Sequence, residues 1–389
     1  MTCWPSCSSS GAAARLAVSL AIGLAACASA PPVAPLAASS ANDSTGSAPG
    51  SRLALFPLEN LTGAPAPVRA TQDALERLLA ARGVELVAGD VVAEFLGKRR
   101  VRYTGGLDGV TAAAAREDLG VGGVVVGTLE SYGMNQGAPV FAATLRLIST
   151  ESEPRILWMD GMAMAGDDAP GPFALGVVFS VPELEAIALK RLADSLAAFL
   201  DGTGPRVPTC TSSSRFKPRV RFRPARPDGR DRISVAVLPF VNETRHRSAG
   251  EAVASEFVRG LAARAWITTL EPGVVRDALL RHRVVMEGGV SLESARIALG
   301  SMDVDVVVSG YVRSFQGYPV PQVDFTVIAI DTRANRVIWQ SSSFNRGDDG
   351  VFFFDAGKVG TAHGLNCRMV ESTVEEMVRG WASNHRPDS

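Results

Sequence analysis

The chain has 389 residues, of which 46% are hydrophobic, and its formal net charge at pH 7 is −1. The length predicts two to three domains, and the hydrophobic content excludes an intrinsically disordered chain. A net charge near zero gives no overall attraction to nucleic acid or to anionic lipid. After residue 30, no stretch is apolar for long enough to span a bilayer as a helix.

Residues 1–26 have the pattern of a cleaved signal peptide. Arg15 precedes a short apolar run, which ends in Leu24-Ala-Ala-Cys27. These four residues resemble the lipobox of bacterial lipoproteins, in which the cysteine thiol takes a diacylglycerol and becomes the new N-terminus. Cys27 is therefore the predicted lipidation site. Cleavage after Ala30, as in an ordinary secretory signal, also fits the pattern of small residues.

Residues 27–51 form a predicted tether, because they are rich in Ala, Pro and Ser. Residue 28 is Ala and residue 29 is Ser. Neither is the Asp that signals inner-membrane retention in lipoproteins of the enterobacterial type. The resemblance to lipoproteins therefore implies an outer-membrane protein that faces the periplasm, with acylated Cys27 in the lipid.

The rest of the chain contains one sequence pattern twice. The segment 53–60 returns 182 residues later as 235–242, and Trp158 returns as Trp339. A repeat that holds its register over this distance indicates two copies of one domain. The predicted boundaries are 52–201 for the first domain, 202–232 for a linker and 233–383 for the second domain.

The first domain follows the same order of elements as the second, and it ends with an amphipathic helix. Apolar residues lie along one face of this helix at helical spacing. They are Leu184, Ile187, Leu192, Leu196 and Phe199.

The predicted linker holds the strongest charge feature of the chain. Between 215 and 232 it carries eight basic residues against two aspartates, and three prolines interrupt it. This composition indicates a stiff, solvated connector. Alternatively, Arg219, Arg221 and Arg223 belong to an arm that binds anionic lipid, lipopolysaccharide or an acidic polymer. The alternation around Phe222 would also let the segment pair as an edge strand.

The second domain shows the order of elements most clearly. An apolar strand at 233–240 is followed by a helix, for which Ser248 and Glu251 form a capping box. The later predicted elements are a strand at 267–270, helices beginning at Pro272 and Ser291, strands at 304–315, 323–331 and 337–344, and a helix at 368–381. Short connections between the last three strands favour an antiparallel meander. Each domain is therefore predicted as a mixed α/β fold with helices packed on a mixed sheet.

Three segments resemble the CsgG-like and TolB-amino-terminal-like domains of envelope lipoproteins. The segment 235–244 resembles their opening strand and loop, 304–310 their central strand, and 330–339 their last hairpin. A weaker resemblance covers 53–160. The resemblance to these domains implies an α/β fold. It also implies a role in secretion, activation of penicillin-binding proteins or transport, because this fold has several envelope functions. None of these relatives is known as an enzyme.

Asn60 and Asn242 are candidate binding residues, because they end the first strand of each domain. Each is followed two residues later by a threonine, Thr62 or Thr244. One interpretation is a ligand loop at the carboxyl edge of the sheet. The alternative is an Asx turn, in which the side chain closes the loop on its own backbone.

Two further features repeat. The aspartate pair 167–168 returns as 348–349, which favours a solvated turn over a metal or acid/base site, because no His or Glu cluster repeats with it. Trp158 and Trp339 occupy matching strand positions, which favours buried packing over a sugar-stacking surface.

The cysteines suit an oxidising compartment. Removal of the signal peptide and lipidation of Cys27 leave Cys210 and Cys367. A disulfide between them is permitted there, but the sequence does not establish the required geometry. No Cys/His spacing suits a metal, and neither a metal nor a cofactor is predicted.

Together these features predict a non-catalytic lipoprotein of the outer membrane, facing the periplasm. It would bind or scaffold other proteins in envelope assembly, cell-wall synthesis or transport. No nucleic-acid partner is predicted, and oligomer formation stays open. One alternative is a curli-type secretion channel subunit, although 161–181 and 341–363 lack the strand alternation that crossing a membrane requires. Another is an enzyme acting on the cell wall, which would need Asp168 or Asp349 within hydrogen-bonding reach of His363.

Overall fold

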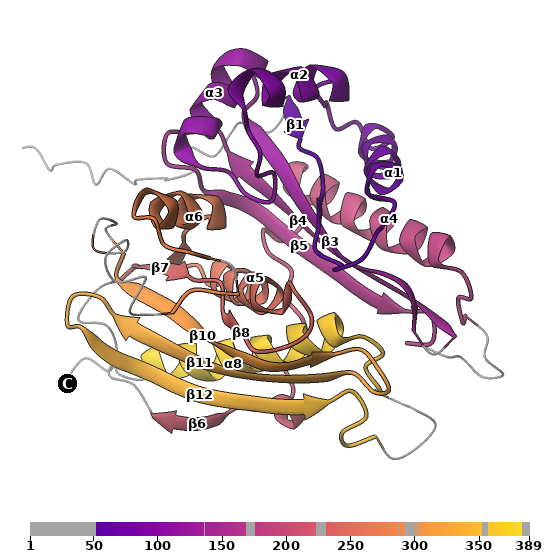
Figure 1. Ribbon diagram of the computed structural model, residues 1–389. Coiled ribbons are helices and arrows are strands. Elements are labelled where there is room, and N and C mark those ends of the chain that lie inside the picture. The colour runs from indigo at the N-terminus through magenta and orange to yellow at the C-terminus, as the bar shows by residue number, and fades with distance from the viewer. Residues whose placement is uncertain are drawn as a thin grey trace, which may run out of the picture. The chain divides into compact units, whose positions relative to one another are not determined.

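The computed structural model describes residues 52–382 except 136, 169–175, 223–230, 287, 292–299, 301, 303 and 352–356. All described residues belong to one compact unit, Thr45–Ser389. The unit contains two mixed β-sheets flanked by helices (Figure 1), which confirms the predicted α/β class. The predicted signal peptide, the lipidation site Cys27 and the tether lie outside the described residues. Among the described residues, no helix combines the length and the apolarity needed to cross a bilayer.

The first sheet has the strand order β1-β3-β4-β5, and β2 pairs with β3 beyond the end of β1. β1 and β2 run parallel to β3, whereas β3, β4 and β5 form an antiparallel meander. The strands are β1 (Leu53–Leu55), β2 (Glu59–Asn60), β3 (Gly123–Asn135), β4 (Ala138–Ser149) and β5 (Ile156–Ala165).

Helices cover both faces of the first sheet. α1 (Val68–Ala80) and α4 (Val181–Leu200) pack on the face that contains Phe141 and Trp158. α2 (Gly89–Arg99) and α3 (Gly109–Leu119) pack on part of the other face, around Phe56 and Phe95. Strand side chains alternate between faces, so β1, β3, β4 and β5 each contribute to two separate clusters.

The second sheet has the order β6-β12-β11-β10-β7-β9, and β8 pairs with β10. Its strands are β6 (Arg219–Phe222), β7 (Ile233–Val237), β8 (Val241–Asn242), β9 (Ile267–Thr269), β10 (Val306–Gln316), β11 (Gln322–Asp331) and β12 (Arg336–Arg346). α5 (Ala249–Ala262) and α8 (Ala362–Ala382) pack on one face, and α6 (Pro272–Arg281) packs on the other face at the β7 end. A short 3₁₀ turn, Ser214–Phe216, precedes β6 and buries Phe216.

The two sheets share one topology. β7, β8 and β10–β12 repeat the order and directions of β1, β2 and β3–β5. The register even shifts at the same place, leaving Glu130 in β3 and Arg313 in β10 as the extra bulge residues. An isolated parallel bridge between Leu53 and Leu86 occupies the place of β9. The repeated sequence therefore corresponds to a repeated strand arrangement, while the domain boundaries stay predictions.

Three predictions about single elements can be compared with the structure. The strand predicted at 233–240 ends earlier, at Val237, and β8 begins beyond it at Val241. Pro239 lies between the two strands and has no amide hydrogen to donate to a ladder. The last helix begins at Ala362 rather than at 368. Gly364 and Asn366 are weak helix formers, but burial of the first turn and a bond from Asn366 Nδ2 to the Ala252 carbonyl override that propensity. The helix predicted from Ser291 lies largely outside the described residues.

The predicted edge pairing around Phe222 is confirmed, because β6 pairs antiparallel with β12. Arg219 and Phe222 face residues of β12 across this ladder, opposite Ser342 and Gln340 respectively. The segment thereby becomes the outermost strand of the second sheet.

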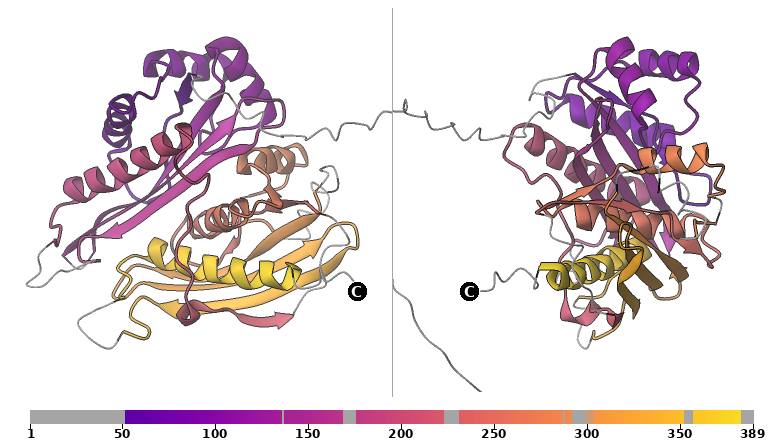
Figure 2. Two further views of the ribbon diagram at one scale, coloured as in Figure 1. Left: turned by 180° about the vertical axis from the view of Figure 1, so that it is seen from behind. Right: turned by 90° about the vertical axis from the view of Figure 1, so that its left-hand side faces the viewer.

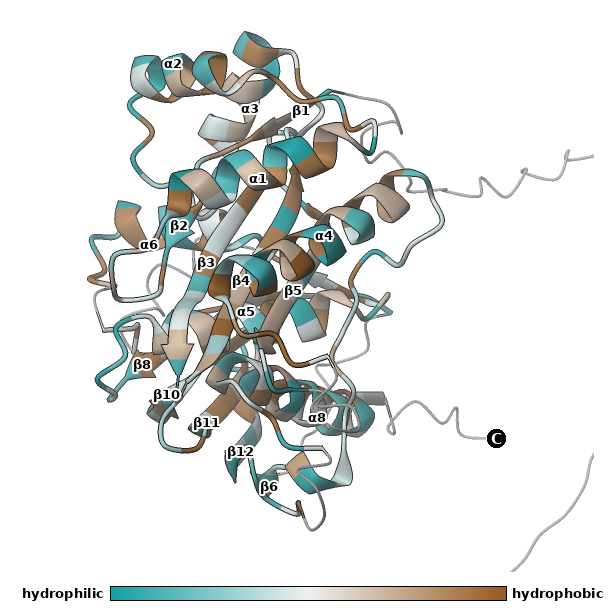
Figure 3. Cartoon of the chain, turned by 90° about the vertical axis from the view of Figure 1, so that its right-hand side faces the viewer, coloured by the Kyte–Doolittle hydropathy of each residue, from teal (hydrophilic) through white to brown (hydrophobic). Residues whose placement is uncertain are grey.

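Helix α5 lies between the two sheets (Figures 1 and 3). Val253, Phe257 and Leu261 face the core of the second sheet. Its opposite side faces β3–β5 of the first sheet, where Arg259 donates a hydrogen bond to the Gly161 carbonyl. α5 therefore builds the contact between the two halves, and the candidate site lies along it.

Candidate functional site

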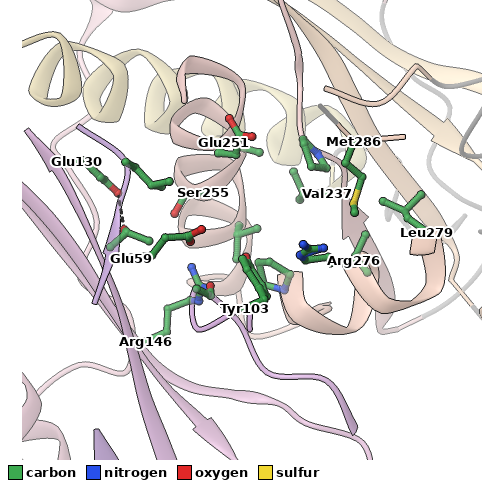
Figure 4. A pocket seen from close by; sticks show the side chains of 18 residues that line it. Glu59, Tyr103, Glu130, Arg146, Val237, Glu251, Ser255, Arg276, Leu279 and Met286 are labelled. Carbon is green, nitrogen blue, oxygen red and sulfur yellow. Dashed lines mark hydrogen bonds between the residues drawn. The ribbon is translucent and has the colours of Figure 1, made fainter. Parts of the chain in front are cut away.

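A cavity of about 320 Å³ lies between the first sheet and the helices α5 and α6 (Figure 4). Residues of β2, β3, β4 and the segment after α2 form one wall, and residues of α5 and α6 form the opposite wall. The first wall is polar, with Glu59, Tyr103, Glu130 and Arg146. The second is mainly apolar and includes Val237, Val258, Val275, Leu279 and Met286.

The polar wall is one face of the first sheet. Thr128 on β3 and Arg146 on β4 have the strand parity that turns them away from α4. Thr128 Oγ1 donates to Glu130 Oε1 over 3.0 Å. Glu59 comes from the end of β2, beside β3. Four polar side chains are thus positioned by three neighbouring strands.

Arg146 and Glu271 form a buried ion pair across the two halves. Arg146 Nε lies 3.5 Å from Glu271 Oε2, and Arg146 is only 5% exposed. Glu271 caps the N-terminus of α6 by accepting a bond from the Gly273 amide, and it also accepts one from the Leu107 amide, each over 3.3 Å. A Cβ atom on Gly106 would come within 3.0 Å of the Gly273 backbone. The pair therefore joins two loops that touch backbone to backbone.

Glu59 and Arg276 line the cavity without a direct partner. No described residue forms an ion pair or a side-chain hydrogen bond with the Glu59 carboxylate or the Arg276 guanidinium. The Arg276 guanidinium lies over the Tyr103 ring, 4.3 Å from its centre, and its Nη1 is buried without a hydrogen bond. Burial raises the pKa of Glu59, although Arg146 opposes this effect. Burial also raises the pKa of Tyr103, which stays neutral.

A second buried charge cluster lies farther along α5. Arg259 Nη2 lies 2.6 Å from Glu256 Oε2, and Arg259 Nη1 lies 3.9 Å from Asp160 Oδ1. The cluster borders a second cavity of about 300 Å³, which Glu130 also lines. Burial and the nearby Glu256 raise the pKa of Glu130 to about 7. Both cavities at the contact between the halves are thus lined in part by ionisable groups.

A disulfide forms a wall of this second cavity. Cys210 and Cys367 are bonded, with their Cα atoms 5.9 Å apart. Arg259 Nη2 contacts the sulfur atoms of both residues. The bridge attaches the segment between the halves to α8, and it resolves the question that the sequence left open.

α5 and α8 cover one face of the second sheet. No described helix covers the opposite face over β10–β12 (Figure 2). One row of residues crosses this face, because each member pairs with the next on the neighbouring strand. The row consists of Tyr311, Thr326, Ser342 and Arg219. Phe344 opposes Asp324, two residues from Thr326, and Phe222 opposes Gln340 on the same side. We call these residues the open face: Arg219, Phe222, Tyr311, Asp324, Thr326, Ser342 and Phe344.

The open face is aromatic and basic. Phe222, Tyr311 and Phe344 are 49%, 39% and 57% exposed. Arg219 is exposed and has no ion-pair partner among the described residues. In the first half, α5 and α6 cover the corresponding part of the sheet, so the two halves differ in what covers this face.

The structure places the predicted asparagines in turns. Asn60 Oδ1 accepts bonds from the Thr62 amide (3.0 Å) and hydroxyl (2.8 Å), and Asn242 repeats both bonds with Thr244 at the same distances. Asn60 also donates from Nδ2 to the Ala64 carbonyl over 2.9 Å. These are the bonds of an Asx turn, and a binding role for either residue stays a prediction. Neither asparagine lines the cavity, although Glu59 precedes Asn60.

The two predicted basic residues that the structure describes lie on the edge strand of the second sheet and do not line the cavity. Arg219 and Arg221 are exposed on β6, and Arg223 lies outside the described residues. Their proposed role in binding anionic lipid or polymer stays a prediction.

The aspartate pairs act within turns. Asp168 accepts bonds from the amides of Ala165 (2.6 Å) and Gly360 (2.9 Å), and Asp349 accepts one from the Arg346 amide (2.8 Å). His363 instead packs against Phe315, with ring centres 4.9 Å apart, and burial lowers its pKa to about 3. The described contacts therefore do not join either aspartate to His363.

Trp158 and Trp339 are both buried in the cores, as favoured from the sequence. Within the described part of the chain, no group of three or more His, Cys, Asp and Glu side chains could hold a metal ion.

Most of the charged cavity residues were missed because they sit in strands or helices that read as apolar, and Tyr103 lies in the segment after α2. One signal was present in the repeat itself. Glu59 corresponds to Val241 at the 182-residue offset, and Arg146 corresponds to Ile328. A charged residue in one copy where the other copy has an apolar one marks a position whose surroundings differ.

The comparisons with known proteins are limited to folds. No protein-family model matches the chain, and no curated protein matches it. Among solved structures, the chain is similar to the PelC dodecamer from Paraburkholderia phytofirmans at 18% identity, covering 40% of this chain and 95% of that one, with a TM-score of 0.26.

Two lipoproteins are also similar in structure to part of the chain. A lipoprotein from Neisseria meningitidis matches at 16% identity, with 32% of this chain and 88% of that one covered, and a TM-score of 0.26. The C-terminal domain of LpoB from Salmonella enterica matches at 20% identity, with 31% and 86% covered, and a TM-score of 0.26. TM-scores this low carry no argument about function, and the resemblance to CsgG-like and TolB-like domains stays a prediction.

Proposed function

We propose that this protein is a non-catalytic lipoprotein of the bacterial envelope that docks another envelope protein on its open face. Acylated Cys27 would hold it in the outer membrane, with the described residues in the periplasm. The partner would belong to envelope assembly, cell-wall synthesis or transport. It would present acidic side chains around an apolar contact.

The open face carries this proposal. Exposed aromatic residues that gather on one surface, together with arginine, have the composition of protein–protein interfaces. Arg219 supplies a positive charge that no described residue neutralises, which favours an acidic partner. Asp324 lies 3.7 Å from Arg313, so that pair neutralises itself and leaves Arg219 as the free charge of the face.

The location rests on two independent features. The residues that precede Cys27 have the lipobox pattern, and the disulfide between Cys210 and Cys367 suits an oxidising compartment such as the periplasm. The alternative of a cell-wall enzyme required Asp168 or Asp349 beside His363, and the described contacts of these residues lie elsewhere.

The test is photocrosslinking in living cells with the full-length lipidated protein. A benzophenone amino acid replaces Tyr311 or Phe344, and Val110 on α3, which is 74% exposed, serves as the control position. We expect both face positions to capture the same envelope protein, and Val110 to capture none of it. Adding Arg219→Glu should reduce the capture by about tenfold, because it places like charges against the acidic partner.

Four outcomes would contradict the proposal. Capture of the same protein at Val110 would show that the contact is not specific to the open face. Crosslinks to lipid alone would show a membrane-facing surface, and crosslinks to a second copy alone would show an interface between copies. Capture that Arg219→Glu leaves unchanged would refute the acidic character of the partner.

A further inference from the structure

The cavity between the halves contains two opposite charges that do not meet. Glu59 projects from the first sheet and Arg276 from α6, and Figure 4 shows both side chains directed into the space between them. Each charge influences the other through space, but the pair forms no direct ion contact. Both side chains are half-buried, and partial loss of hydration without a partner is costly for a charge, so their separation across a cavity points to a ligand that bridges them.

Arg146 lowers the pKa of Glu59 through space, but its direct ion pair is with Glu271. It also donates a hydrogen bond to the carbonyl of Gly105, which lines the cavity beside it. Its Nε remains buried without a hydrogen bond. Glu59 therefore has no direct ion pair among the described residues, and Glu130 and Glu251 add further carboxyl groups to the cavity lining.

Arg276 forms the positive end. Its guanidinium is held over the Tyr103 ring, which fixes its orientation without using its N–H donors. Nη1 is buried and has no acceptor. A planar guanidinium held in this way is suited to receive a carboxylate through parallel hydrogen bonds.

The remaining wall sets the size and polarity of the occupant. Val258, Val275, Leu279 and Met286 line the side between α5 and α6. A volume of about 320 Å³ lies at the small end of ligand pockets. An apolar wall of this kind offers contact to a hydrocarbon group, so the lining suits an organic molecule with one apolar part.

We propose that this cavity binds a small zwitterion of the dipeptide class with one apolar side chain. Its ammonium group would lie against the Glu59 carboxylate, with Ser255 nearby on α5. Its carboxylate would accept hydrogen bonds from Arg276, and its apolar side chain would pack on Leu279 and Met286. The molecule would complete the polar contacts that the protein itself leaves open between its two halves.

The test combines altered ligands with altered protein. Isothermal titration calorimetry on the full-length protein in detergent uses the dipeptide alanyl-leucine, its N-acetylated form and its C-amidated form. We expect saturable binding of the zwitterion, and binding at least about tenfold weaker for each blocked form, because each loses one charge-assisted contact.

The variants assign each contact to a residue. Glu59→Gln should lower the affinity for the zwitterion by about tenfold. It should leave the affinity for the N-acetylated form unchanged, because that form has no ammonium group to contact Glu59. Arg276→Gln should weaken binding of the zwitterion by about tenfold, because it removes the contact to the carboxylate. It should leave the affinity for the C-amidated form unchanged. Glu94→Gln and Arg69→Gln remove exposed charges on α2 and α1 and should leave every affinity unchanged.

The outcomes that overturn the proposal are distinct. Wild-type protein that binds none of the three compounds at about 10 mM would refute a site for this class. Equal binding of the zwitterion and the C-amidated form would show an amine site, and equal binding of the N-acetylated form would show a carboxylate site. The blocked ligands are measured with the wild-type protein. They therefore test the proposed site even if one of the variants fails to fold.

Discussion

Charged side chains inside this protein are paired across long distances in the sequence. Arg146 meets Glu271, and Arg259 meets both Glu256 and Asp160. Desolvation offsets most of the attraction in a buried ion pair, so such a pair contributes little net stability. Removing one member is different, because the remaining charge stays buried without compensation.

Replacement of Arg259 by leucine should therefore be strongly destabilising. Glu256 and Asp160 would both lose their only nearby cation among the described residues, and we expect the free energy of unfolding to fall by about 3–5 kcal/mol. Urea denaturation at neutral pH measures this change. Arg379→Leu is the matched control, because Arg379 is exposed and its pairs with Glu375 and Glu376 should contribute less than about 1 kcal/mol. Equal losses in the two variants would contradict this account.

Glu130 should make stability depend on pH. Burial raises its pKa from 4.5 to about 7 in the folded protein. Because the folded-state pKa is the higher one, the stabilisation of its neutral form is complete below about pH 4.5 and is lost as the pH rises through 7. We expect Glu130→Gln to raise the free energy of unfolding by about 3 kcal/mol near pH 8 and to leave it unchanged near pH 4.

Urea denaturation of wild type and Glu130→Gln at both pH values tests this expectation. Glu94→Gln, at an exposed position on α2, should show no such difference. A stability change of the same size at both pH values would indicate altered packing instead of titration.

At the scale of elements, the central strand of each sheet needs a glycine at the same place. Gly127 in β3 and Gly310 in β10 lie beneath the chain that links the first two strands, where Leu58 and Phe240 cross over them. A Cβ atom at 310 would lie 1.9 Å from the Thr326 carbonyl oxygen, whereas one at 127 would first meet leucine side-chain ends at 2.5 Å. Backbone cannot move aside as easily as the end of a side chain.

Gly310→Ala should therefore destabilise the protein more than Gly127→Ala does. We expect Gly310→Ala to lower the free energy of unfolding by about 3 kcal/mol, at the upper end of overpacking effects. Gly97→Ala in α2 is the control, because open space surrounds that position and alanine should stabilise the helix by about 0.5–1 kcal/mol. Thermal and urea unfolding of the three variants would refute the argument if Gly127→Ala were the most damaging.

At the scale of the whole molecule, the halves are joined by contacts of several kinds. α5 packs between the sheets, the Arg146–Glu271 pair links two loops, and Asp168 accepts a bond from Gly360. The disulfide adds a covalent link between α8 and the segment that connects the halves, with a sequence separation of 157 residues.

Loss of this disulfide should reduce stability without changing the fold. The bridge restricts the unfolded chain, so replacing Cys210 and Cys367 together by alanine should lower the free energy of unfolding by about 2–5 kcal/mol. Guanidinium unfolding with and without a reductant measures the effect. Reduced wild type should match the double variant, and the double variant should not respond to reductant. A wild type that is insensitive to reductant would contradict the expectation.

Much of the fold was readable from local patterns. Apolar runs, turn residues and the internal repeat predicted mixed α/β elements in the right order, including the edge strand at Phe222. These signals are local because strand alternation, helix periodicity and turn chemistry act over a few residues. Residues that are repeated in sequence, such as Trp158 and Trp339, also share their burial in the structure.

The site depended on contacts that no local pattern contains. Glu271 bonds the Leu107 amide 164 residues away, and Arg259 approaches Gly161 across 98 residues. Only the packing of the second half against the first sheet brings Glu59 and Arg276 to one cavity and leaves the open face uncovered. Hydrophobic periodicity is dictated by each element alone, whereas the partner of a buried charge is decided by which elements meet, and that is a property of the tertiary structure.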